Sequence, residues 1–281
     1  LGIHPEWRAV NPLGDPHKIG PFYMACWSSP YMDFVLRQIE ELVEGYDVDG
    51  YWLDIMPYAR QVPQVTDMVN DLPVPCYCLS CQRAYEQALG VRPPLHPTPA
   101  EAEQSYQFLL GQGERFLTRA VDIIRAHRPE ALVTYNGDGA PGDPMELGDL
   151  VSIEGHAPMY ARQSFIARWG QASGKPFEIL TAGGLPSYET GGGWNGFDQK
   201  PATVMELETA LAVSHGGSAV FGIAPYPDGR IDPAQAAGFS KAFHRVRDLE
   251  PWLREPEGVS DIGVLLLTKP RTASLHWYEM T

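Results

Sequence analysis

The four cysteines of this 281-residue chain share a spacing that is typical of a metal site. Cys76, Cys78 and Cys81 form a C-x-C-x-x-C sequence, and Cys26 lies far upstream. Three thiols at this spacing converge on one metal ion, and a fourth from a distant loop completes a tetrahedron. Because four sulfur ligands leave no open coordination position, we expect structural Zn²⁺ bound by all four cysteines. Buried free thiols or a disulfide are the alternative, but neighbouring cysteines in C-x-C are poorly placed to bridge.

Two carboxylates stand where apolar runs end. Asp54 follows Tyr51-Trp52-Leu53, and Glu154 directly follows Leu150-Val151-Ser152-Ile153. A carboxylate beside large apolar side chains is costly unless it is hydrogen-bonded or functional. One carboxylate that attacks an anomeric carbon and a second that protonates the leaving oxygen are what hydrolysis of a glycosidic bond requires. Asp54 and Glu154 are therefore the candidate catalytic pair.

Side chains that could bind a sugar lie in the same strand-end loops. Aromatic rings can stack on the apolar face of a sugar ring, and amides, carboxylates or imidazoles can bond its hydroxyl groups. The candidate substrate-binding residues are Trp7, Trp52, Tyr58, Asn136, Asp138, His156, Trp194 and Tyr226.

Each catalytic assignment has an alternative. Asp54 could be a helix N-cap or a structural partner of an arginine. Glu154 could bind a hydroxyl group or act structurally. Glu189 and Asp198 flank the glycine-rich stretch around Trp194, and either of them could be the acid/base instead of Glu154. A hydrogen-bonded loop or core histidine is the default role for His156.

The chain alternates short apolar runs with helical patterns, which predicts an α/β fold. Runs at residues 48–53, 131–135, 150–153, 177–180 and 218–223 predict strands buried on both faces, and helices are predicted over 34–46, 98–129, 203–214 and 233–249. The long polar loops after the strands favour a (β/α)8 TIM barrel, whose catalytic loops lie at the C-terminal ends of the strands. No G-x-G-x-x-G motif follows a strand, so we expect no organic cofactor.

A closed barrel needs eight strands. We therefore expect an N-terminally truncated barrel, with about three strands preceding Leu1 in a longer polypeptide. Residues 1–254 would form the catalytic barrel. Residues 255–281 would form a linker and the start of a following α/β domain, because the apolar run 262–267 follows an acidic stretch that contains proline.

The net charge of −14 limits the partners. Binding to nucleic acid or to an anionic membrane depends on clustered basic charge, so neither partner is expected. No apolar run is long enough to span a bilayer. No His-x-His or His-Glu-x-x-His motif supports a metal-dependent hydrolase. Reduced thiols suit a cytoplasmic protein, which is the expected location.

The cysteine pattern resembles that of a known enzyme family. The segment Ala25 to Tyr31, followed by the C-x-C-x-x-C sequence and Tyr85, resembles the zinc-bearing cluster of family 42 β-galactosidases. The segment Ser260 to Ser274 is similar to the start of the trimerisation domain in those enzymes. The resemblance implies a homo-oligomer, either a trimer or a dimer, formed through the C-terminal region.

One departure points to a second family. Family 42 enzymes carry Asn-Glu after the fourth strand, whereas the equivalent stretch Val48 to Asp54 has neither residue. That stretch resembles the Trp-Phe-Asp nucleophile strand of family 29 α-L-fucosidases, and especially the barrels of the hypothetical glycosyl hydrolase family 6. The latter resemblance covers Pro5 to Trp252, through the order of its motifs.

The resemblance implies a retaining double displacement with Asp54 as nucleophile, and it leaves the acid/base unassigned. From the residues and the resemblance together we expect a retaining exo-glycosidase that is fucosidase- or galactosidase-like and acts on an oligosaccharide or glycoconjugate. The alternative is a catalytically degenerate, carbohydrate-binding barrel, which would keep the aromatic residues and the zinc but lack one carboxylate.

Overall fold

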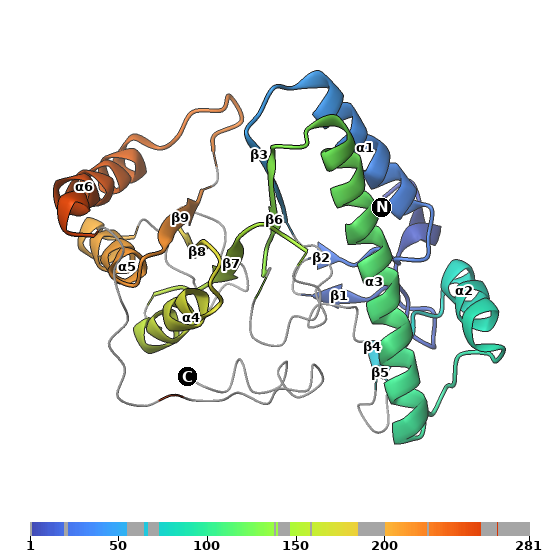
Figure 1. Cartoon of the computed structure of the whole chain (residues 1–281). Coiled ribbons are helices and arrows are strands. Elements are labelled where there is room, and N and C mark those ends of the chain that lie inside the picture. Colours follow the sequence, from blue (N-terminus) through green and yellow to red (C-terminus); the bar gives the residue numbers. More distant parts are fainter. Residues whose placement is uncertain are drawn as a thin grey trace. The chain divides into compact units, whose positions relative to one another are not determined.

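The computed structural model describes residues 2–19, 22–54, 65–66, 73–137, 139, 147–157, 159–184, 200–223, 225–253 and 263. Two compact units make up the chain, residues 1–133 and 134–281. The domain boundary predicted after residue 254 lies outside the described residues, and so does the C-terminal domain predicted over 255–281 except for residue 263. Figure 1 labels the elements along the chain.

Among its described residues, the first unit combines three α-helices with short strands. In chain order it contains η1 (Pro5–Trp7), β1 (Lys18–Ile19), β2 (Phe22–Tyr23), α1 (Tyr31–Gly45), β3 (Gly50–Leu53), β4 (Val65–Thr66), β5 (Pro73–Val74), α2 (Leu79–Leu89), α3 (Pro99–His127) and the start of β6 (Leu132–Tyr135). The pairs β1–β2 and β4–β5 are antiparallel, and each strand in them has two residues. Strands this short carry no periodicity, so the sequence did not predict them.

Helix α3 is the longest element of this unit and packs against α1 (Figure 1). Leu36, Ile39 and Val43 recur on one face of α1 and are buried, as the predicted amphipathic helix requires. Helix α3 begins at the predicted capping box. The Thr98 hydroxyl accepts from the Glu101 backbone N–H, and the Glu101 carboxylate accepts from the Thr98 backbone N–H.

Strand β3 pairs with β6, starting from the hydrogen bond that Leu132 N donates to Asp49 O at 3.0 Å. The prediction that β3 is buried on both faces is wrong, because its residues alternate between exposed and half-buried. Trp52 is 37% exposed, and Asp54 at the end of the strand is exposed as well. The cost of burying a carboxylate therefore does not single out Asp54.

The second unit is built from strand–helix repeats. Strands β7 (Val151–Glu154), β8 (Phe177–Ala182) and β9 (Ser218–Gly222) alternate with α4 (Tyr160–Ala172), α5 (Ala202–Ser214) and α6 (Pro233–Leu249), and η2 (Glu250–Trp252) follows. The three strands are parallel and pair in chain order, with Val151 opposite Phe177 and Glu178 opposite Ser218. A parallel sheet whose strands follow one another in this order is the arrangement found in β/α barrels.

The core of the second unit lies between β7, β8, α4 and α5. It includes Val151, Ile153, Ile166, Phe177 and Ala212, all nearly inaccessible. β7 and β8 are therefore mostly buried, as predicted, whereas the residues of β9 are half-buried or exposed and the prediction of full burial is wrong there. One edge of β9 pairs with β8, and no further strand pairs with β9 among the described residues.

The fold is thus mixed α/β with parallel strands, as the alternation of apolar runs predicts. All five predicted strands exist, and α5 and α6 match their predicted ranges within one residue. Helices α2 and α4 were not predicted. A closed eight-stranded barrel stays a prediction. Over the described part of the chain, no helix has both the length and the apolar character that crossing a membrane would need.

Candidate active site

The C-terminal ends of β7 and β8 carry a group of polar side chains. Glu154 is the last residue of β7, and the loop 155–157 follows it directly. Gly155 N donates to Leu180 O at 2.8 Å, which ties this loop to β8. On the other side of β7, Gly137 N donates to Ser152 O at 2.8 Å and brings Asn136, at the end of β6, next to the same sheet. This sheet edge is where β/α proteins place catalytic residues.

His156 is fixed in this loop by a backbone donor. Its Nδ1 atom accepts a hydrogen bond from Ala182 N at 3.1 Å, so the neutral ring carries its proton on Nε2. Nε2 lies 3.9 Å from Oε1 of Glu154, which is too long for a direct hydrogen bond. The side chains of His156 and Glu154 are 15% and 28% exposed, so both are partly accessible. Sequence analysis placed these residues in separate roles, and the structure brings them together.

The pKa of His156 is lowered to about 4, mainly by burial and in addition by the positive charges of Lys200 and Arg162. At neutral pH the ring is therefore uncharged. A neutral imidazole with a defined Nε2–H can donate to an oxygen acceptor, while the nearby carboxylate can accept from a hydroxyl group.

A buried polar network lies beneath this loop. It consists of the ion pair between Lys200 Nζ and Glu208 Oε2, 2.7 Å apart, together with Thr181 and Gln163. The side chains of Lys200 and Glu208 are 0% and 2% exposed. Burial lowers the pKa of Lys200, and the hydrogen bond to Glu208 acts in the opposite direction. A charged pair this deeply buried is tolerated only when hydrogen bonds satisfy its remaining atoms.

This network was not predicted, although the sequence contains a signal for it. Met205, Glu208, Thr209 and Ala212 have the spacing of one helix face, and all four are buried. A glutamate on the apolar face of a predicted helix implies a buried partner. Lys200 lies eight residues away and looks like an ordinary surface lysine next to a proline.

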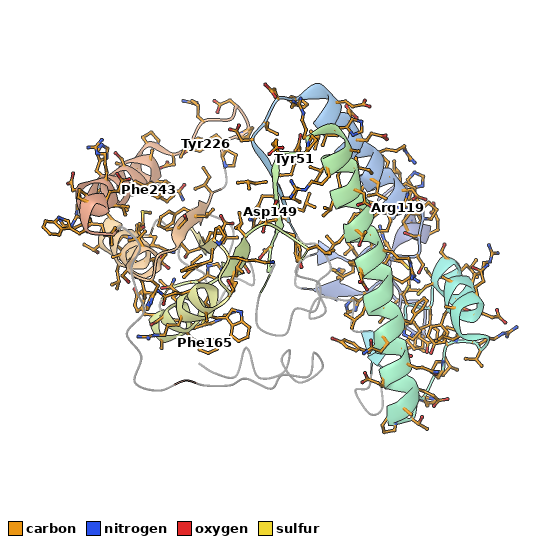
Figure 2. All side chains as sticks on the ribbon, in the orientation of Figure 1. Tyr51, Arg119, Asp149, Phe165, Tyr226 and Phe243 are labelled. Carbon is orange, nitrogen blue, oxygen red and sulfur yellow. The ribbon has the colours of Figure 1, made fainter. Side chains whose placement is uncertain are left out.

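The other predicted site residues occupy different places. Asp54 follows β3 in the first unit, whereas Glu154 belongs to the second. Trp7 is half-buried and stacks on His4 with ring centroids 3.9 Å apart. Tyr226, in the loop after β9 (Figure 2), donates its hydroxyl to Asp232 at 2.8 Å and is 41% exposed. The residues that lie outside the described part are Tyr58, Asp138, Glu189, Trp194 and Asp198.

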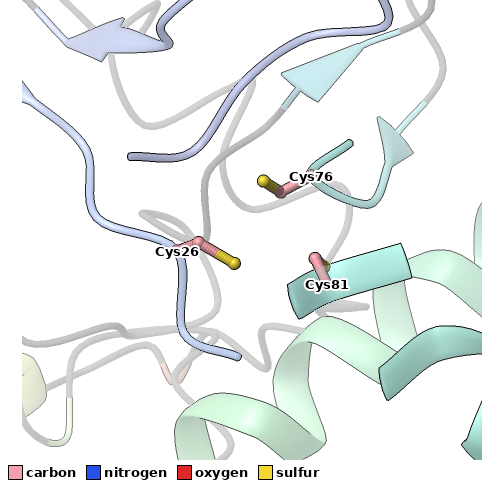
Figure 3. A group of neighbouring side chains, drawn as sticks. All are labelled: Cys26, Cys76 and Cys81. Carbon is pink, nitrogen blue, oxygen red and sulfur yellow. The ribbon is translucent and has the colours of Figure 1, made fainter. Parts of the chain in front are cut away.

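The four cysteines are buried in the first unit. The Sγ atoms of Cys26, Cys76 and Cys81 all lie within 4.8 Å of one another, and Cys78 belongs to the same core cluster. Figure 3 shows the three side chains converging from three segments: the loop before α1, the loop after β5 and the first turn of α2. All four thiols are free. This buried group could hold a metal ion, as the spacing predicts.

Backbone donors surround the sulfur atoms. Val10 N and Cys78 N each donate to Cys76 Sγ at 3.3 Å, and Cys81 N donates to Cys78 Sγ at 3.4 Å. Hydrogen bonds from the other three thiols lower the pKa of Cys76, whereas the hydrogen bond with Cys76 is the largest cause that raises the pKa of Cys26. One thiolate is therefore favoured, but further deprotonation accumulates negative charge that only a cation would balance. This donor set fits a soft divalent metal such as zinc.

The fold of the chain is similar to part of several solved glycosidases. It is similar to an alpha-L-fucosidase, isoenzyme 2 from Paenibacillus thiaminolyticus, with a TM-score of 0.69 and 24% identity over 90% of this chain and 36% of that one. It is also similar to the cold-adapted beta-galactosidase from Rahnella sp. R3, with a TM-score of 0.59 and 15% identity over 89% of this chain and 44% of that one.

A third similar structure is the beta-galactosidase from Bacillus circulans sp. alkalophilus, with a TM-score of 0.59 and 14% identity over 90% of this chain and 44% of that one. The chain thus spans less than half the length of each of these proteins. No family model matches the sequence, and no curated protein matches it. Structural similarity at this level of identity establishes the fold, and the reaction has to be argued from the site.

Proposed function

We propose that this chain forms most of the catalytic barrel of a retaining exo-glycosidase that is fucosidase- or galactosidase-like. One observation carries the proposal: the Glu154 carboxylate and the His156 donor lie together at the C-terminal end of β7. In β/α proteins this sheet edge holds the catalytic groups, and the similar solved structures are named as a fucosidase and β-galactosidases. The substrate class is an oligosaccharide or glycoconjugate.

In this proposal Asp54 attacks the anomeric carbon, and the glycosidic C–O bond breaks as Glu154 protonates the leaving oxygen. Glu154 then removes a proton from water, which attacks the same carbon and releases Asp54. A retaining enzyme requires the two carboxyl groups about 5 Å apart, and a separation of about 7–9 Å would indicate inversion. Asn136 and His156 would bind hydroxyl groups of the sugar.

The cysteine cluster has a structural role in this proposal. Zn²⁺ bound by Cys26, Cys76, Cys78 and Cys81 would neutralise the thiolates and hold the loop before α1 onto α2. A site filled by four sulfur atoms offers no position to a substrate. We further propose a cytoplasmic homo-oligomer whose catalytic barrel extends to residue 254.

The test is a hydrolysis assay with the full-length protein on aryl α-L-fucoside and aryl β-D-galactoside, extended to other aryl glycosides. We expect release of the aryl group from at least one of them, with the first-formed sugar retaining its anomeric configuration by proton NMR. Binding of the free sugars without hydrolysis of any glycoside would instead support the degenerate, carbohydrate-binding barrel. Inverted product would exclude Asp54 as a nucleophile.

A further inference from the structure

The buried network of Lys200, Glu208, Thr181 and Gln163 has no part in the chemistry proposed above, yet it is built around the loop that carries His156. Glu208 Oε1 accepts from Ala157 N at 2.7 Å, from Gln163 Nε2 at 2.9 Å and from Thr181 Oγ1 at 2.9 Å. Its other oxygen binds Lys200, whose Nζ also donates to Thr181 Oγ1 at 3.0 Å. A carboxylate with this many donors is held in one position.

The same network fixes both sides of the loop. Gln163 Nε2 donates to Gly155 O at 2.9 Å, and Ala157 N donates to Glu208, so the residues before and after His156 are both anchored. Thr181 immediately precedes Ala182, whose N–H binds His156 Nδ1. Loop position and ring orientation therefore depend on the same buried carboxylate.

The orientation has a chemical consequence at the Nε2 edge of the ring. Because Nδ1 accepts from Ala182, the proton of the neutral ring is on Nε2, which lies 3.9 Å from Glu154 Oε1. An oxygen atom placed about 2.8 Å from both atoms fits this separation and can accept from one and donate to the other. Only a hydroxyl group or water satisfies both at once.

We propose that Glu208 is a positioning residue: held by its buried ion pair with Lys200, its carboxylate fixes the loop 155–157 so that His156 is a neutral Nε2–H donor beside Glu154 and binds, with it, one hydroxyl group of a carbohydrate. The carbohydrate in this inference rests on the proposed function, whereas the positioning does not.

The charged groups around His156 agree with this role. Burial is the main cause that disfavours a second proton on the ring, and the charges of Lys200 and Arg162 act in the same direction. The nearby carboxylate of Glu154 would favour protonation, and that of Glu208 is paired with Lys200. The ring is therefore a donor that keeps one protonation state over the pH range in which most histidines titrate.

The direct test is nitrogen NMR of the histidine-labelled full-length protein between about pH 5 and 8. In the wild type we expect His156 to show a protonated Nε2 and an unprotonated Nδ1 throughout this range. Addition of monosaccharides, including L-fucose and D-galactose, should shift the Nε2 signal. A ring that is cationic or protonated on Nδ1 at neutral pH overturns the inference, and absence of a shift with every sugar overturns the hydroxyl-binding role.

Two variants separate positioning from stability. In Glu208→Gln the amide nitrogen faces Lys200 Nζ, so two hydrogen-bond donors meet and the network should rearrange. We then expect His156 to lose its single tautomer and kcat to fall about tenfold or more. In the double variant Lys200→Met with Glu208→Gln, the amide oxygen can still accept from Ala157, Gln163 and Thr181. We expect that variant to regain the tautomer and most of kcat.

The matched control is Lys241→Met, which removes an ion pair between α6 and α5: Lys241 Nζ lies 2.6 Å from Glu206 Oε1, and the lysine side chain is 60% exposed. It should change neither the His156 spectrum nor kcat. The inference is overturned if Glu208→Gln folds and keeps both the wild-type tautomer of His156 and the wild-type kcat. If Glu208→Gln fails to fold, the double variant decides, and a folded double variant in which His156 has lost the Nε2–H tautomer also overturns the inference. A protein that hydrolyses no glycoside yet shows these NMR changes contradicts the proposed function and supports the positioning role.

Discussion

Gly170 of α4 lies so close to Phe177 of β8 that a Cβ atom on the glycine would be 2.5 Å from Cγ of the ring. Carbon atoms cannot approach to this distance, so the space is filled by the aromatic ring alone. The same ring would meet a Cβ on Gly217 at 2.2 Å. Phe177 thus packs against two glycines, and its burial in the core of the second unit depends on both.

We predict that Gly170→Ala lowers the free energy of unfolding by about 1–3 kcal/mol, because the ring or the helix must shift to admit the methyl group. Gly111→Ala is the matched control. It is also a glycine within a helix, and its added Cβ would meet only Arg115 Nη1, at 3.7 Å. Alanine there should raise stability by about 0.5–1 kcal/mol. Urea unfolding of both variants measures the difference, and equal effects would contradict the packing described.

For the proposed nucleophile, we predict that Asp54→Asn lowers kcat by at least about 10³-fold, since an amide cannot attack the anomeric carbon. Asp54 is exposed, so the variant should keep the fold and the metal content. Asp49→Asn is the control, because that residue also flanks β3 and uses its backbone carbonyl to bind Leu132. Turnover that survives in the Asp54 variant would remove this residue from the mechanism.

For the cysteine cluster, we predict a single zinc ion per chain in protein purified without added metal. Cys81→Ser should lose the metal and several kcal/mol of stability, because ligand loss leaves thiolates without a balancing cation. Ser80→Ala, one residue earlier on α2, should change neither quantity. Metal analysis and thermal unfolding provide the two measurements. Intact folding with negligible metal would show that the cluster is a group of buried thiols.

The shifted histidine makes stability depend on pH. The pKa of His156 is about 4 in the folded protein and 6.5 as its ordinary value, so between these values the unfolded chain binds more protons than the folded one. Stability should therefore rise with pH through this window and fall as pH decreases from about 6.5 to 4, by on the order of 1–3 kcal/mol.

The measurement is urea unfolding at several pH values. His156→Gln should flatten the dependence relative to wild type, whereas His127→Gln, on the surface of α3, should not. Burial also lowers the pKa of His17 and of His215, so these residues should retain part of the slope in the variant. An identical slope in wild type and in His156→Gln would contradict the buried, neutral imidazole.

The sequence predicted those elements whose own residues carry the signal. The apolar runs of β7 and β8 are continuous because both are mostly buried, and Thr98 and Glu101 mark the start of α3 through a local capping box. The grouping of the cysteines could also be predicted from the sequence, because three of the four lie within six residues.

The features that could not be predicted from the sequence depend on contacts between residues far apart in the chain. Helix α4 was missed because Gln163, a polar residue, occupies its buried face and Gly170 lies near its end, so no clean apolar stripe exists. The buried partners of Glu208 come from β8, from α4 and from a position two residues before α5, and no local pattern relates them. Glu154 and His156 were found as candidates, but their shared geometry comes from Ala182, which carries no side-chain signal.

The chain-order pairing of β7, β8 and β9 bears on how the second unit folds. In the part of the chain that the structure describes, one helix lies between the strands of each ladder, in which Val151 is opposite Phe177 and Glu178 is opposite Ser218. Contacts between residues a few tens of positions apart cost little loop entropy. A nascent chain could thus complete one strand–helix–strand step before the next strand has been synthesised, which favours stepwise assembly over the slow search that distant strand pairs require.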